Sequence, residues 1–104
     1  MYSLEVKPFE DHLEATVRGD LTIFEAEAFH RDLAQIVTNH PKITLELGDV
    51  TAFDTSSLQI LAWATREASG RKGVLSLQHP SECICDAYRW LGLEGELNRM
   101  LVTS

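Results

Sequence analysis

Apolar and polar residues alternate at the start of the chain, whereas the segment that follows carries apolar residues at helical spacing. The alternation predicts two short half-buried strands with a polar turn at residues 10–12 between them. Thr22 and Glu25 form a capping-box pattern, so we expect a helix to begin at Thr22 and to end before Pro41. The apolar residues of the two strands are Leu4, Val6, Phe9, Leu13, Ala15 and Val17.

The rest of the chain alternates between strand and helix patterns. Strands are predicted at residues 43–47 and 74–77, and a helix between them is expected to end at Gly70. A third helix, capped by Ser81 and closed by Gly92, is expected to be packed by Tyr88, Trp90 and Leu91. The tail from Leu93 to Ser104 fits a short strand or a last helix equally well.

The element order is therefore β-β-α-β-α-β-α plus a tail. This order predicts a single α/β domain spanning residues 1–104, with helices packed on a mixed β-sheet.

Composition narrows the class of protein. With 104 residues and a formal net charge of −7, the chain lacks the basic face that nucleic-acid binding requires. It has neither the apolar run of about 20 residues that a membrane span needs nor the apolar stretch of a signal peptide. Cys83 and Cys85 are expected to be free thiols. These features predict a cytoplasmic protein with no direct membrane insertion.

Motifs for catalysis and cofactor binding are missing from the sequence. The four histidines show no metal-ligand spacing, and there is no nucleophile elbow of the G-x-S-x-G type. There is also no glycine-rich phosphate loop. We therefore expect no catalytic residue, no bound metal and no cofactor.

The densest cluster of small polar residues is Asp54-Thr55-Ser56-Ser57, between a predicted strand and the helix that follows it. Such residues cap helices, but a helix N-terminus also favours an anion, including the phosphate of a phosphoserine. Both interpretations stay open from spacing alone. Further along this helix, Trp63 fits either a residue at the core boundary or an aromatic contact for a protein partner.

The stretch from Leu45 to Leu58, which contains Phe53-Asp54-Thr55-Ser56-Ser57-Leu58, resembles the signature of the STAS domain. This domain is shared by bacterial anti-sigma-factor antagonists and the cytoplasmic parts of sulfate transporters. Weaker matches flank the motif in the expected order, at residues 19–21 and 91–93.

The resemblance implies a non-enzymatic protein-binding module in signal transduction and transcription regulation. In the anti-sigma-factor antagonists a partner serine kinase phosphorylates the serine of this motif, which here is Ser56, and a phosphatase restores it; Ser57 and Thr55 are the alternatives. The kinase would be an anti-sigma factor or a related signalling ATPase, which includes ATPases of chemotaxis systems. ATP would be bound by this kinase and not by the STAS domain. The expected partner-binding residues are Asp20, Thr22, Asp54, Thr55, Ser57 and Trp63.

Two positions depart from the family pattern. Ser57 replaces the usual glycine after the phosphorylated serine, and Thr22 replaces an aspartate before the first helix, for which Asp20 could compensate.

The alternative function is that of a STAS subunit docking on the ATPase of a membrane ABC transporter. Asp54-Thr55 also matches the motif of the transporter-associated STAS subunits, and docking of those subunits on the ATPase requires no phosphorylation. A serine at position 56 favours the phosphorylated switch.

Overall fold

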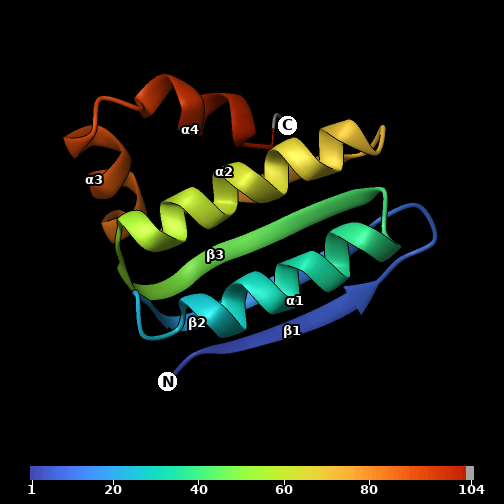
Figure 1. The fold of residues 1–104 in the computed structure, drawn as a ribbon, viewed down its shortest axis with the longest axis horizontal. Coiled ribbons are helices and arrows are strands. Elements are labelled where there is room, and N and C mark those ends of the chain that lie inside the picture. Colours follow the sequence, from blue (N-terminus) through green and yellow to red (C-terminus); the bar gives the residue numbers. More distant parts are fainter. Residues whose placement is uncertain (103–104) are drawn as a thin grey trace.

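The computed structural model describes residues 1–102 as an α/β sandwich of one sheet and four helices (Figure 1). Its strands are β1 (Ser3–Pro8), β2 (Leu13–Leu21), β3 (Lys42–Phe53) and β4 (Val74–Gln78), and its helices are α1 (Ala26–Asn39), α2 (Thr55–Gly70), α3 (Glu82–Trp90) and α4 (Glu94–Met100). The predicted fold class, a mixed sheet covered by helices, is confirmed.

The four strands lie side by side in the order β1-β2-β3-β4. β1 and β2 form an antiparallel hairpin, and β2, β3 and β4 run parallel to one another. Because the carboxyl ends of parallel strands meet at one edge of a sheet, α1, α2 and α3 all begin near that edge, at the left of Figure 1. β2 and β3 stay paired up to Leu21 and Phe53, so the loops that leave them start side by side.

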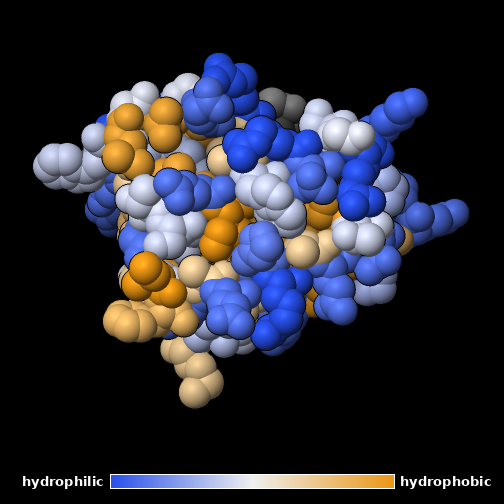
Figure 2. All heavy atoms as spheres, viewed as in Figure 1, coloured by the Kyte–Doolittle hydropathy of each residue, from blue (hydrophilic) through white to orange (hydrophobic). Residues whose placement is uncertain are grey.

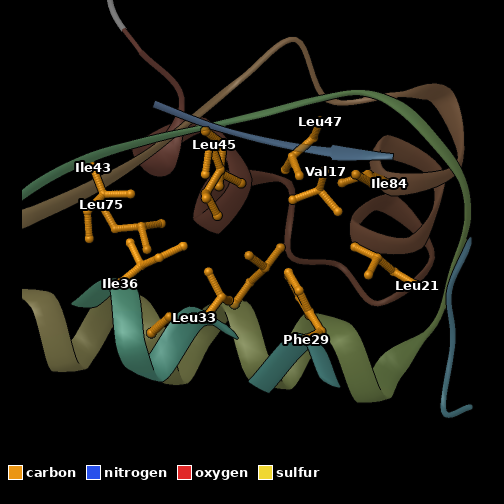
Figure 3. Close-up of a cluster of buried hydrophobic side chains, with 14 of the residues drawn as sticks. Val17, Leu21, Phe29, Leu33, Ile36, Ile43, Leu45, Leu47, Leu75 and Ile84 are labelled. Carbon is orange, nitrogen blue, oxygen red and sulfur yellow. The ribbon is translucent and has the colours of Figure 1, made fainter. Parts of the chain in front are cut away.

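One face of the sheet is buried under the helices. Along β2 and β3 the inward residues are apolar, while their neighbours on the other face are polar and only half-buried. Figure 3 shows Phe29, Leu33 and Ile36 of α1 pointing toward this buried face. The inward residues of the three parallel strands include Leu13, Ala15, Val17, Ile43, Leu45, Leu47, Leu75 and Leu77.

Gly19 allows β2 to pass beneath the N-terminus of the chain. Its φ is +91°, and a Cβ atom there would lie 2.1 Å from the carbonyl oxygen of Met1. Glycine is therefore required both by the backbone conformation and by the close approach. The register shifts between Gly19 and Asp20, and β2 stays paired with β3 up to Leu21.

The structure corrects two local predictions, the start of the first helix and the packing of Trp90, and it decides the open alternative for the tail. The first helix begins at Ala26, because residues 22–25 form turns before it. The tail contains a helix, α4, followed by a bridge between Leu101 and Leu77, while residues 103–104 lie outside the described chain. Trp90 does not pack α3: its side chain is 87% exposed at the end of that helix.

Candidate functional site

The start of α2 is tied to the loop between β2 and α1 by the carboxylate of Asp54. One oxygen, Oδ1, accepts a hydrogen bond from the Ser57 backbone N–H at 3.4 Å and caps α2. The other, Oδ2, accepts from the backbone N–H of Ile23 at 2.8 Å. Asp54 therefore caps the helix, as one of the two sequence interpretations expected, and it also fixes the preceding loop beside the helix.

Ser57 forms a second link between the same two segments. Its hydroxyl donates to the carbonyl oxygen of Leu21 at 2.9 Å, and the Asp54 N–H donates to the same oxygen at 3.3 Å. The Ser57 side chain is fully buried. Contrary to our expectation from the sequence, Ser57 offers no surface to a partner in this conformation and its hydroxyl is shielded from a kinase.

Thr22 and Asp20 lie beside this junction. The Glu25 carboxylate accepts from the Thr22 N–H at 2.8 Å and from its hydroxyl at 2.7 Å, which stabilises the turn that precedes α1. Asp20 is exposed and accepts a hydrogen bond from the Thr51 hydroxyl at 2.7 Å. The structure thus brings Asp20, Thr22 and Asp54 to the same edge of the sheet.

The three hydroxyl residues of the motif differ in accessibility. Thr55 is exposed, Ser56 is half-buried and Ser57 is buried. Within residues 1–102, the Ser56 hydroxyl makes no hydrogen bond to another side chain or to the backbone. Ser56 is therefore partly accessible in the first turn of α2, where the helix dipole favours an anion. The one acidic side chain at this helix start is the capping Asp54, two residues before Ser56.

Ser56 shares one side of α2 with two apolar side chains. Residues 56, 60 and 63 recur at helical spacing, and all three are half-buried. The side faces α1, because the ring of Trp63 lies 4.5 Å from that of His30. We call Ser56, Ile60 and Trp63 the α1 flank of α2. Trp63 packs against the core at this boundary, which is one of its two sequence interpretations.

Sequence reasoning missed two apolar residues at the site. Ile23 is 66% exposed and Phe24 is 90% exposed, in the loop that Asp54 holds beside α2. Figure 2 shows apolar side chains gathered over this loop, at the lower left. The sequence did contain a signal for this surface. Ile23 and Phe24 are consecutive apolar residues between Thr22 and α1, and they do not belong to the buried face of that helix, so they could have been predicted to be exposed.

Two kinds of feature are absent from the described residues. Residues 1–102 contain no cluster of three histidine, cysteine or acidic side chains placed to hold a metal ion. In the same range, no helix has the length and apolarity required to cross a bilayer.

A small α/β domain whose helix begins on an Asp-Thr-Ser sequence, directly after a central parallel strand, has the architecture of a STAS domain. The family model described as "Mlab, STAS domain" matches residues 9–103, and the chain belongs to this family. The resemblance inferred from the sequence is thereby confirmed.

Solved structures agree with this assignment at the level of the fold. An anti-sigma factor antagonist from Mycobacterium paratuberculosis is 16% identical, with a TM-score of 0.81 over 92% of this chain and 82% of that chain. The anti-sigma factor antagonist SpoIIAA in its unphosphorylated form is 13% identical, with a TM-score of 0.75 over 98% and 88% of the two chains.

The phosphorylated form of SpoIIAA, described as a Bacillus cell fate determinant, is 15% identical, with a TM-score of 0.73 over 100% of this chain and 91% of that chain. No curated protein matches the sequence of this chain.

Proposed function

We propose that this STAS domain is a non-enzymatic binding module for a signalling protein, switched by phosphorylation of Ser56. The partner kinase would be a serine-kinase anti-sigma factor or a related signalling ATPase, and a phosphatase would reverse the reaction. The observation that carries the proposal is the placement of a partly accessible serine in the first turn of α2, beside an exposed apolar loop.

The apolar loop supplies the docking surface. Ile23 and Phe24 are held in place by the hydrogen bond from the Ile23 N–H to Asp54, so little freedom is lost when a partner covers them. Exposed aromatic and aliphatic side chains of this size often provide much of the free energy of a protein interface. Together with Thr55 and Ser56 they form the surface that we propose for the partner.

Phosphorylation would act on the partner more than on the fold. A phosphate adds about −1.5 to −2 charges at neutral pH. At Ser56 the N-terminus of α2 stabilises that charge, so the domain remains folded. The apolar or acidic surface of a docked partner would instead be repelled, because the phosphate lies next to Ile23 and Phe24 on a protein with net charge −7.

The two solved forms of SpoIIAA support the proposal. One is unphosphorylated and the other is phosphorylated, and both resemble this chain in fold. A STAS domain of this architecture is thus compatible with both chemical states.

The test combines phosphorylation and binding. The purified domain is incubated with ATP and a candidate kinase-like ATPase from the same organism, and the modified residue is mapped by intact-mass measurement and peptide sequencing. We expect one phosphate on Ser56. Ser56→Asp should weaken binding to the ATPase at least tenfold, whereas Ser56→Ala should bind like the wild type. The matched control Ser69→Ala, an exposed serine near the other end of α2, should also bind like the wild type.

Phosphate found only on Thr55 or Ser57, or wild-type affinity of Ser56→Asp, would contradict the switch. Binding without any phosphate transfer, lost in Phe24→Ser and retained in Ser56→Asp, would favour the alternative, a STAS subunit docked on a transporter ATPase.

A further inference from the structure

A cleft lies on the opposite side of α2 from the α1 flank. It lies between α2, the start of β4 and the α3–α4 segment, and its volume is about 470 Å³. Small-molecule sites occupy about 300 to 1,000 Å³ and are mostly apolar with a few polar groups. Leu58, Ala62 and Leu93 give this cleft an apolar lining.

Tyr88 is one of the residues that line the cleft, and it carries a buried hydroxyl without a hydrogen-bond partner in the described part of the chain. Its side chain is 1% exposed, and within residues 1–102 the hydroxyl has no hydrogen-bond partner. A buried hydroxyl without a partner destabilises a protein by about 1 to 3 kcal/mol, so such groups are rare in folded proteins. The ring is held in place by stacking on Phe53 at 6.2 Å between ring centres.

The Tyr88 hydroxyl is a permanent hydrogen-bond donor. Burial, and to a lesser extent the nearby charge of Glu96, raises the pKa of Tyr88 to about 12. The hydroxyl therefore stays protonated at neutral pH and is suited to a ligand atom that accepts a hydrogen bond.

The mouth of the cleft carries a local positive charge on an acidic protein. Arg66 of α2 and Arg99 of α4 both line it, and Glu96 is the acidic residue among them. Glu96 forms an ion pair with Arg99, whereas Arg66 makes no salt bridge within residues 1–102. The uncompensated charge at the mouth is thus that of one guanidinium, which prefers a carboxylate.

We propose that this cleft binds an apolar monocarboxylate. The apolar body lies along Leu58, Ala62 and Leu93, and the carboxylate is attracted by Arg66 and accepts the hydrogen bond that Tyr88 lacks. Long surface side chains of α4, such as Arg99 and Met100, shift on entry to let the carboxylate reach the hydroxyl. The proposal is independent of phosphorylation, because the cleft and Ser56 lie on opposite sides of α2.

Binding is tested with sodium decanoate, below its micelle concentration, by titration of the amide NMR spectrum. We expect saturable shifts confined to residues 58–69, 73–75 and 88–101, and weaker binding of decylammonium, which reverses the charge of the head group. Tyr88→Phe should weaken decanoate binding about fivefold, the effect of one hydrogen bond. It should also raise the unfolding temperature, because it removes the unpaired hydroxyl.

Two further variants locate the ligand. Ala62→Trp fills the cleft from a half-buried position and should abolish the shifts, and Arg66→Gln should weaken binding severalfold. Arg71→Gln, at the end of the same helix but outside the cleft, is the matched control and should bind like the wild type.

The proposal is overturned if decanoate causes no saturable shifts, if decylammonium binds as tightly, or if folded Ala62→Trp binds unchanged. A Tyr88→Phe variant that is less stable and binds decanoate as well as the wild type would also overturn it, since the hydroxyl would then have a structural partner.

Discussion

The two sides of α2 are built differently although they belong to one helix. On the α1 flank, a long neighbouring helix packs against Ile60 and Trp63, and Trp63 contacts His30. On the other side the neighbours are the short helices α3 and α4, which leave a cleft beside Ala62. The long helix α1 therefore fills one side of α2, whereas the short helices α3 and α4 leave a cleft on the other side.

The difference separates the two kinds of binding that the domain offers. The α1 flank ends at Ser56, next to which Asp54 holds the loop with the exposed residues Ile23 and Phe24; this is the surface that we propose for a protein partner. The opposite side encloses space and contains one unpaired hydroxyl, that of Tyr88, which suits a small molecule. Variants on the two sides should therefore differ in stability as well as in binding.

The largest expected contrast is between two adjacent serines. Ser57→Asp places a charge in a fully buried position and should lower the free energy of unfolding by more than about 3 kcal/mol. Ser56→Asp, half-buried at the N-terminus of α2, should stay within about 0.5 kcal/mol of the wild type. Urea denaturation of both variants measures the difference. Equal stability of the two would mean that Ser57 is as accessible as Ser56.

A smaller contrast is expected between Trp63→Ala, which removes a ring from the α1 flank, and Ala62→Leu, which adds a larger side chain in the cleft. Trp63→Ala should lower the free energy of unfolding by about 2 kcal/mol, less than for a fully buried tryptophan, because the ring is only half-buried. It should also weaken partner binding by more than about 1 kcal/mol if the ring belongs to the interface. Ala62→Leu, its counterpart across the helix, should change stability by less than about 0.5 kcal/mol.

Thermal and urea unfolding of this pair, with partner titration of the folded proteins, check the prediction. A stability loss for Ala62→Leu as large as that for Trp63→Ala would show that the cleft is closed in solution.

The three parallel strands and α2 could be predicted from sequence because local pattern and tertiary burial agree there. In β1 they disagree, because Val6 is exposed although it belongs to the alternating apolar set. Alternating residues such as Leu45 and Leu47 are buried where the alternation indicated, and Asp54 caps α2 as its type and position suggested. The start of α1 could not be predicted, because Glu25 accepts from the Thr22 N–H and hydroxyl while a distant carboxylate, Asp54, accepts from the Ile23 N–H.

The candidate site at the start of α2 also depends on contacts that the sequence could not predict. The motif residues were identified from their order, but the sequence could not rank three consecutive hydroxyls by accessibility. That ranking depends on the Leu21 carbonyl, which lies 36 residues away in the chain and accepts from Ser57. The prediction for Trp90 was wrong for a different reason. Residues 88 and 90 are separated by about 200° around a helix, so Trp90 lies on the exposed side while Tyr88 is buried.

The smallest expected contrast concerns the polar links on the two sides of α2. Asp54→Ala removes the cap and the acceptor of the Ile23 N–H, and should lower the free energy of unfolding by about 1 kcal/mol. Thr65→Val, on the cleft side, removes a hydroxyl near the Leu61 carbonyl and the Met100 sulfur, at 2.9 and 3.4 Å. Because that hydroxyl links α2 to α4 only through sulfur, a weak acceptor, we expect a loss below about 0.5 kcal/mol.

Urea denaturation ranks the two variants, and hydrogen exchange of the Ile23 amide reports the loop directly. Exchange should accelerate in Asp54→Ala and stay unchanged in Thr65→Val, and Asp54→Asn, which keeps one amide oxygen as an acceptor, should fall between them. If Asp54→Ala leaves Ile23 protected, the loop is held by its own turn. The apolar surface would then form without α2, and the coupling between Ser56 and the partner would have to pass through direct charge repulsion alone.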